Sequence, residues 1–271
     1  MRKKVLVIAL LCIFGAGSLC AWNTFRARAP APAAAQPADG LPDMLKEAAL
    51  YESRNDLIKA RDTYQSALEK YPASKDIVKI QESLDDLNIK ILFSPVITPD
   101  SVQYEVRKGD SLTKISKNYN TTIDLIARSN NLKDQKIALG EKLKVSGSKF
   151  SVGVSKSQNT LTLKSDGRIL KIYRVSTGKD NSTPVGVFKI TTRIVDPSWY
   201  VNNRVIPAGN PENILGSRWL GISIKGYGIH GTTEPESIGK QATAGCVRMR
   251  NTDVEELFTI VPIGTEVVIV D

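Results

Sequence analysis

The spacing of hydrophobic residues divides the chain into stretches of different structure. From residue 41 to about 93, apolar residues recur every three or four positions, as on the buried face of an amphipathic helix. From 149 to 271 they gather in short, β-branched runs separated by Gly, Asp, Asn and Pro, which predicts a mostly β domain. Between them, residues 102–146 predict a strand, two helices and a second strand. The chain is therefore expected to be multidomain.

The N-terminus carries its own hydrophobic signal. Basic residues at positions 2–4 precede an uncharged apolar run over residues 5–22. A basic start followed by an apolar run is typical of an export signal, and a run of this length can also just span a bilayer. We expect residues 1–22 to be either a cleaved signal peptide or a membrane anchor, followed by an Ala/Pro linker over 23–40. Either way the remainder is exported to the periplasmic or cell-wall face of the membrane.

The helical stretch over residues 41–93 predicts a helical hairpin followed by a further helix from about Lys75 to Leu92. Its small and aromatic positions resemble one tetratricopeptide unit, and one such unit cannot bury its own apolar face. The positions that carry this resemblance are Ala48, Tyr51, Ala60, Tyr64, Ala67 and Pro72. This α-helical hairpin segment is expected to be either a spacer or a docking site for a protein partner.

Polar residues in the stretch 102–146 indicate where its helices begin. Asp110 is expected to cap a helix through Tyr119, and Thr121 or Thr122 is expected to cap a second helix that ends near Ser129. A βααβ unit of this size is too small for an enzyme and suits a binding module.

The residues of this unit resemble the lysin motif (LysM). The motif positions are filled by Tyr104, Val106, Gly109, Asp110, Ser111, Leu112, Ile115, Leu125, Asn130, Gly140 and Leu143. The resemblance implies a LysM domain over 102–146 that binds N-acetylglucosamine in peptidoglycan or chitin. The implied glycan-binding groove includes Gly109, Asp110, Ser111, Leu112, Asn131 and Ile137.

Charge and composition exclude some functions. The net charge of +9 favours an anionic partner, but the basic residues are spread along the chain and no nucleic-acid-binding motif is present. We therefore expect no nucleic-acid partner. One histidine and one exported cysteine cannot build a typical transition-metal site, so we expect neither a metal nor an organic cofactor.

Two residues in the β-rich stretch are chemically distinctive. His230 is the only histidine of the chain, and Cys246 is the only cysteine outside the N-terminal apolar run. A neighbouring imidazole can deprotonate a thiol to give a thiolate–imidazolium pair, and the backbone N–H groups of Gly245 and Cys246 are candidate oxyanion donors. Spacing alone does not bring the two side chains together, and the alternative is a core histidine and a buried thiol.

The sequence around these residues resembles the L,D-transpeptidase catalytic domain. The matching positions are His230, Gly231, Thr232, Ser237, Ile238, Gly239, Thr243, Gly245, Cys246, Val247, Arg248, Met249 and Asp253, and upstream Ser176, Thr177, Gly178, Thr183, Pro184, Gly186 and Phe188. The resemblance covers residues 149–271 and implies an L,D-transpeptidase-like β-sandwich. In the same domain, Thr252 to Glu255 has the form of a capping box, which predicts one helix that ends before Pro262.

The resemblance also implies roles for residues. Cys246 would be the nucleophile, His230 the base, and the Gly231 carbonyl would orient the imidazole. Arg248 would hold the donor or the loop, with a plain ion-pair role as the alternative. The candidate oxyanion or substrate-binding residues are Gly245, Arg248, Thr243 and Tyr227.

The implied reaction cross-links peptidoglycan. Cys246 would attack the third residue of a tetrapeptide stem, release D-Ala, and pass the acyl group from a thioester to an amine. Ala244 stands where many members of the family have a second histidine, which puts acceptor handling or rate in question. Two alternatives stay open: an L,D-carboxypeptidase, in which water resolves the thioester, and a non-catalytic wall-binding scaffold.

Overall fold

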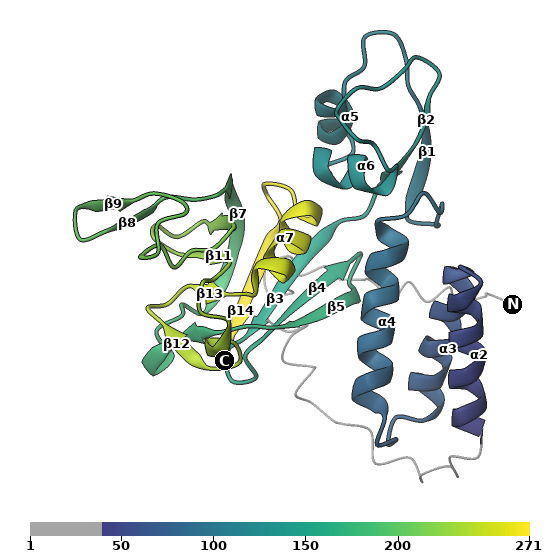
Figure 1. Cartoon of the computed structure of the whole chain (residues 1–271), viewed down its shortest axis with the longest axis horizontal. Helices are drawn as coiled ribbons and strands as arrows, with labels where there is room; N and C mark the ends of the chain where they lie inside the picture. The colour runs from purple at the N-terminus through teal and green to yellow at the C-terminus, as the bar shows by residue number, and fades with distance from the viewer. Residues whose placement is uncertain (1–39) are drawn as a thin grey trace, which may run out of the picture.

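The computed structural model describes residues 40–271 (Figure 1). The predicted export segment 1–22 and the linker up to residue 39 lie outside the described residues. Within the described part of the chain, no helix has both the length and the apolar character needed to cross a bilayer.

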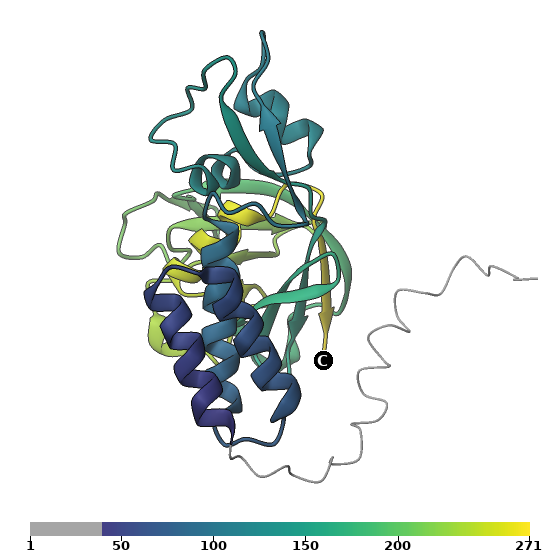
Figure 2. The same cartoon turned by 90° about the vertical axis from the view of Figure 1, so that its right-hand side faces the viewer.

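Three helices form the N-terminal part of the described chain: α2 (Leu41–Ser53), α3 (Leu57–Lys70) and α4 (Ile77–Leu92). They lie side by side, as Figure 2 shows, around a small core that includes Ala48, Ala60, Tyr64 and Ile80. The predicted hairpin and the further helix are therefore present as three packed helices.

Helix α4 covers the edge of the β domain. Strand β5 (Arg168–Arg174) is the last strand of the large sheet, and its outer backbone groups would otherwise be unpaired. The Asp85 carboxylate accepts from the backbone N–H of Ile172 at 2.9 Å, and Asn88 Nδ2 donates to the carbonyl of Leu170 at 3.1 Å. The helical segment therefore uses side chains of α4 to close a sheet edge.

The LysM unit is built as expected from two strands and two helices. Strand β1 pairs antiparallel with β2, and the helices pack on a core that includes Leu112, Ile115 and Val145. The elements are β1 (Ser101–Glu105), α5 (Leu112–Asn118), α6 (Ile123–Ser129) and β2 (Lys142–Ser146).

One predicted cap in this unit is wrong. Ser111, and not Asp110, caps α5, because its hydroxyl accepts from the Lys114 N–H at 3.2 Å. Asp110 instead accepts from the N–H of Arg107 at 2.8 Å and from the Tyr104 hydroxyl at 2.7 Å. The second cap is Thr122, one of the two residues expected for it.

Residues 149–271 form a mostly β domain. Its large sheet has the strand order β13-β11-β10-β7-β14-β3-β4-β5. The strands are β3 (Phe150–Ser155), β4 (Thr160–Ser165), β5, β7 (Gly186–Val195), β10 (Arg218–Ile222), β11 (Gly228–His230), β13 (Val247–Arg248) and β14 (Glu266–Val270). Shorter pairs are β6 (Thr177–Gly178) with β12 (Gln241–Thr243), and β8 (Trp199–Val201) with β9 (Arg204–Ile206).

The expected sandwich of two sheets takes a different form. Strand β7 is long enough to belong to both halves: it pairs with β14 along Gly186–Lys189 and with β10 along Ile190–Val195. All eight strands are thereby hydrogen-bonded in one order, and a single core fills the domain.

Helix α7 (Asn251–Ile260) covers this core with Val254, Leu257 and Ile260. The predicted capping box is wrong, because the helix begins earlier and Thr252 lies within its first turn, where its hydroxyl contacts Asp253. The helix ends before Pro262, as expected.

The LysM unit shares this core with the β domain. Leu125 of α6 and Ile89 of α4 belong to the same hydrophobic cluster as the strands of the large sheet. The Thr122 hydroxyl donates to the Thr259 carbonyl of α7, and Arg193 of β7 binds Asp124 at 2.9 Å. The three parts of the described chain are therefore packed against one another.

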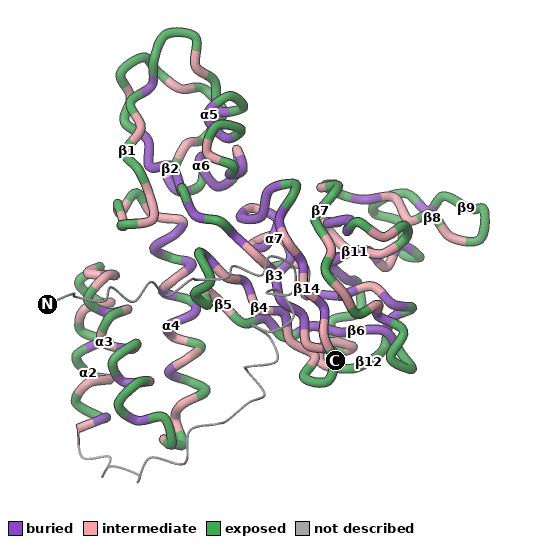
Figure 3. The backbone as a smooth tube through the Cα atoms, turned by 180° about the vertical axis from the view of Figure 1, so that it is seen from behind, coloured by how far each residue is buried: buried purple, intermediate pink, exposed green. Residues whose placement is uncertain are grey.

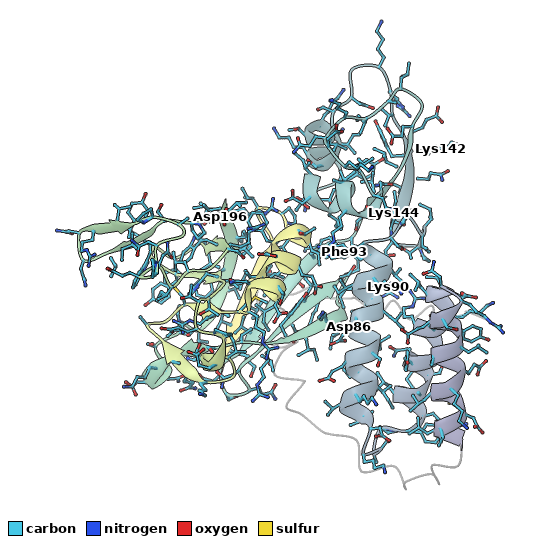
Figure 4. The ribbon with its side chains drawn as sticks, in the orientation of Figure 1. Asp86, Lys90, Phe93, Lys142, Lys144 and Asp196 are labelled. Atoms are coloured by element: carbon cyan, nitrogen blue, oxygen red, sulfur yellow. The ribbon has the colours of Figure 1, made fainter. Side chains whose placement is uncertain are left out.

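A buried lysine completes this joint. Lys144 of β2 points at the C-terminal end of α4, as Figure 4 shows, and its Nζ donates to the carbonyls of Ile91 at 2.7 Å and Ser94 at 2.9 Å. The Ile91 carbonyl belongs to the last turn of α4 and also accepts from Ser94, and the Ser94 carbonyl lies just beyond the helix. Burial lowers the pKa of Lys144 to about 8.

Candidate active site

The sheet register places His230 next to the strand that follows Cys246. Strand β11 pairs in parallel with β13, with Ile229 opposite Val247 and His230 opposite Arg248. Ile229 and Val247 belong to the core cluster, so their neighbours His230 and Arg248 point to the other face of the sheet. Figure 3 colours the backbone by burial and shows buried residues along the strands of this sheet. Cys246 directly precedes β13, and its Sγ lies 3.7 Å from the carbonyl oxygen of Gly226, in the turn that leads into β11. The fold therefore brings the thiol close to the strand that carries the imidazole.

The imidazole is held by a backbone carbonyl. His230 Nδ1 lies 2.6 Å from the carbonyl oxygen of Gly231. A carbonyl can only accept, so Nδ1 carries the proton and Nε2 keeps its lone pair. In this tautomer Nε2 is the nitrogen that can act as a base.

Trp219 supports the imidazole from the neighbouring strand. It is the cross-strand partner of His230 on β10, and the two rings stack with centroids 5.8 Å apart and planes 19° apart. Gly228 leaves room for this ring, because a Cβ there would lie 2.6 Å from the indole.

Burial favours the neutral forms of both groups. Burial lowers the pKa of His230 to about 4, and the positive charge of Arg248 acts in the same direction, against the Gly231 carbonyl. Burial also raises the pKa of the Cys246 thiol, while the Gly228 backbone and the Arg248 charge oppose that change. Both shifts favour a neutral thiol and a neutral imidazole over the thiolate–imidazolium pair considered from the sequence.

A threonine closes the turn that carries the nucleophile. The Thr243 hydroxyl donates to the carbonyl of Cys246 at 2.6 Å and accepts from the N–H of Gly245 at 3.1 Å. Thr243 is buried, and its hydroxyl serves the turn rather than an open surface. Of the two proposed oxyanion donors, the N–H of Gly245 is occupied inside the turn, which leaves that of Cys246 as the candidate.

Tyr227 packs directly on this turn. Gly245 has a φ of +131°, and a Cβ at this position would lie 2.7 Å from the Tyr227 ring. The backbone of the turn approaches the aromatic ring as closely as only glycine allows. The structure thus brings Tyr227 beside the nucleophile's turn.

Arg248 holds the loop beside the site. Its Nη1 donates to the Glu234 carboxylate at 2.6 Å and to the Ser237 hydroxyl at 2.9 Å. The side chain is buried, and its Nε has no hydrogen-bond partner. Of the two roles expected for Arg248, this geometry corresponds to holding the loop.

The sequence analysis missed Asn251, the first residue of α7. Its side chain bonds to the backbone of Thr232 and Ser217, immediately behind His230. Asn251 lies between the matched positions Met249 and Asp253, and a polar residue at a helix start was the signal that could have drawn attention to it.

The predicted glycan-binding residues lie on two loops of the LysM unit. Gly109 and Asn131 are exposed and have positive φ values, and Ile137 is half-buried. The side chain of Leu112 is buried in the LysM core, so only its backbone is left to face a glycan.

Comparisons with known families match both predicted domains. The sequence model of the YkuD L,D-transpeptidase catalytic domain matches residues 149–269, and that of the LysM domain matches residues 104–146. YqjB of Bacillus subtilis (strain 168), named as an L,D-transpeptidase, is 43% identical over 124 residues, which are 44% of this chain and 69% of that protein. YkuD of the same strain, named likewise, is 34% identical over 172 residues, or 61% of this chain and 97% of that protein.

Solved structures show a more distant similarity. An L,D-transpeptidase from Mycobacterium smegmatis matches with a TM-score of 0.40 and 19% identity, over 49% of this chain and 64% of that one. The catalytic domain of an E. faecium L,D-transpeptidase matches with a TM-score of 0.38 and 24% identity, over 45% of this chain and 96% of that domain.

Proposed function

Because this chain belongs to the L,D-transpeptidase family, we propose that it cross-links peptidoglycan by acyl transfer through Cys246, with His230 as the base. The observation that carries the proposal is the hydrogen bond from Nδ1 of His230 to the Gly231 carbonyl. It leaves Nε2 unprotonated, on a strand that lies close to the thiol. The two residues are thus in the states that proton abstraction requires.

The first half-reaction breaks an amide. As Sγ of Cys246 attacks the carbonyl of the third stem residue, Nε2 of His230 takes the thiol proton. The N–H of Cys246 donates to the developing oxyanion. The C–N bond to the terminal D-Ala then breaks, the imidazolium returns its proton to the leaving amine, and a thioester remains on Cys246.

The second half-reaction restores the thiol. An amine of a second stem, or of a protein, attacks the thioester carbonyl while Nε2 accepts its proton. The new amide forms, the C–S bond breaks, and the thiolate of Cys246 recovers the proton from His230. The active site regains its starting state.

The other parts of the chain are proposed to bring this reaction to the cell wall. The LysM unit is proposed to bind N-acetylglucosamine through its two exposed loops, which raises the local concentration of stem peptides. Residues 5–22 are proposed to direct export and to anchor the enzyme or be cleaved from it, so that catalysis takes place outside the cytoplasm.

The direct test is mass spectrometry of the full-length chain incubated with a disaccharide-tetrapeptide. We expect cross-linked dimers that lack one D-Ala, and we expect Cys246→Ala to form none while it keeps its circular dichroism spectrum. Tripeptide as the sole product would replace the proposal by an L,D-carboxypeptidase. The absence of any product or thioester with a folded wild-type chain would contradict enzymatic function.

A further inference from the structure

The amide of Asn251 binds both peptide groups of Thr232. Its Oδ1 accepts from the Thr232 N–H at 2.9 Å and from the Ser217 N–H at 3.2 Å, and its Nδ2 donates to the Thr232 carbonyl at 2.9 Å. The side chain therefore joins the start of α7 to two loops that meet behind His230.

One of these peptide groups is the group that holds the catalytic imidazole. The N–H of Thr232 and the carbonyl of Gly231 belong to a single peptide unit. A trans peptide is planar, with its N–H and C=O pointing in opposite directions. When Asn251 fixes the direction of the N–H, it fixes the direction of the carbonyl that accepts from Nδ1 of His230.

The surrounding backbone is shaped around this amide. A Cβ on Gly231 or on Gly216 would lie 2.2 Å from Oδ1 of Asn251, which no side chain tolerates. The preceding His230–Gly231 peptide is fixed separately, because Gly231 N–H donates to the Arg218 carbonyl and His230 O accepts from Met249 N–H. The next peptide, Gly231–Thr232, is the one that Asn251 holds.

We propose that Asn251 is a positioning residue that selects the catalytic tautomer of His230 through the Gly231–Thr232 peptide. The hydrogen bonds run in series from Nδ1–H of His230 to the peptide, and from the peptide to Oδ1 of Asn251. Bonds in series polarise one another, so the amide also strengthens the carbonyl as an acceptor. The catalytic consequence rests on the proposed function, whereas the control of the tautomer does not.

The test uses the fact that His230 is the only histidine. In the full-length chain labelled with ¹⁵N-histidine, the nitrogen shifts report the tautomer of this one ring without assignment. We expect a single Nδ1–H tautomer at neutral pH in the wild type, and a mixture with the Nε2–H form in Asn251→Ala. An unchanged single tautomer in a folded Asn251→Ala chain would overturn the proposal.

Asn130 offers a matched control. Its side chain makes the same kind of bridge in the LysM unit, accepting from Lys144 N–H at 2.7 Å and donating to the Lys144 carbonyl at 2.8 Å. Asn130→Ala is expected to lose stability and to keep the wild-type tautomer. A tautomer change of equal size in Asn130→Ala would show a general effect of destabilisation and would overturn the proposal.

A second variant covers the case in which Asn251→Ala does not fold. Asn251→Asp keeps an acceptor for both N–H groups and adds a negative charge near the imidazole. We expect it to keep the Nδ1–H tautomer and to raise the pKa of His230 above the wild-type value. A mixed tautomer in Asn251→Asp would contradict the proposal.

Kinetics then connect the tautomer to turnover. We expect Asn251→Ala to lower kcat about tenfold or more with little change in KM, since the wrong tautomer leaves the base protonated. A wild-type chain with the Nδ1–H tautomer but no transpeptidation would refute the proposed function alone. A mixed tautomer at unchanged kcat would refute the positioning role alone.

Discussion

At the scale of residues, the site is defined by groups that are neutral because they are buried. His230 ends strand β11 and Cys246 directly precedes β13; burial and the Arg248 charge act on the pKa of both groups. In the proposed mechanism the thiol proton is transferred only when a substrate is attacked, and we expect a slow reaction of the free thiol with other electrophiles. This property has a measurable effect on stability.

The pKa of His230 predicts how stability depends on pH. The folded value of about 4 lies below the usual value of 6.5, so the unfolded chain binds the proton first as pH falls. The contribution of His230 is complete above about pH 6.5 and is lost progressively toward pH 4, with a loss of about 2 kcal/mol at pH 5. Denaturant unfolding at pH 7.5 and pH 5 measures it.

The matched comparison is with His230→Gln, which cannot titrate. We expect the free energy of unfolding of the wild type to fall more between the two pH values than that of the variant. Equal falls in both proteins would show that the imidazole is not kept neutral by burial.

Cys246 and His230 could be chosen as the proposed nucleophile and base from the sequence, because His230 is the only histidine and Cys246 the only cysteine after residue 22. The supports around them could not be predicted. Asn251 acts through the backbone of Thr232, and Trp219 acts through a cross-strand register, and neither relation is visible in residue spacing. Thr243 was assigned to the substrate because the motif contains it, whereas its hydroxyl is used inside the turn.

At the scale of elements, the most consequential one is α4, which closes the β5 edge. The carboxylate of Asp85 is 4% exposed and accepts from the Ile172 N–H, and burial raises its pKa. The Asp85 carboxylate thus accepts a hydrogen bond that the carbonyl of a further strand would otherwise accept.

Removing the Asp85 carboxylate should leave the Ile172 N–H at the edge of the sheet without its partner. We expect Asp85→Ala to lower the free energy of unfolding by about 1–3 kcal/mol, because it leaves the part-buried N–H of Ile172 without its partner and removes a side chain that is itself buried. Asp86→Ala is the control: its ion pair with Lys171 involves a carboxylate that is 75% exposed, so a loss of no more than about 1 kcal/mol is expected. Equal losses in the two variants, measured by urea titration, would contradict an edge-closing role for Asp85.

The sequence predicted the existence of these elements better than their ends. The long strands and helices follow from periodicity, but Asp110 and Ser111 are both good caps, and the Tyr104 hydroxyl decides between them by occupying Asp110. The shared strand β7 was missed because its two partners pair with different halves of one continuous run.

At the scale of the whole molecule, the LysM unit and the β domain share one joint. Leu125, Ile89 and Leu92 extend the core of the β domain toward the LysM unit, and Lys144 binds the end of α4. The sequence could not reveal this joint, since it is built from contacts between residues far apart in the chain, such as Lys144 with Ile91 and Thr122 with Thr259.

The joint predicts cooperative unfolding. The full-length chain should show one calorimetric transition for the LysM unit and the β domain, and Lys144→Met should separate it into two, because the bonds from Lys144 to the carbonyls of Ile91 and Ser94 are lost. Lys142→Met, on the same strand but exposed, is the control and should leave one transition. Two transitions in the wild type would mean that the contacts do not couple the parts.

The packed joint has a geometric consequence for the wall. A binding domain on a flexible linker would let Cys246 reach many stem peptides around one glycan-binding position. A binding domain packed rigidly on the β domain keeps the proposed glycan-binding loops at one distance from Cys246. We therefore expect the cross-links to form at a constant distance from the sugars that the LysM unit binds.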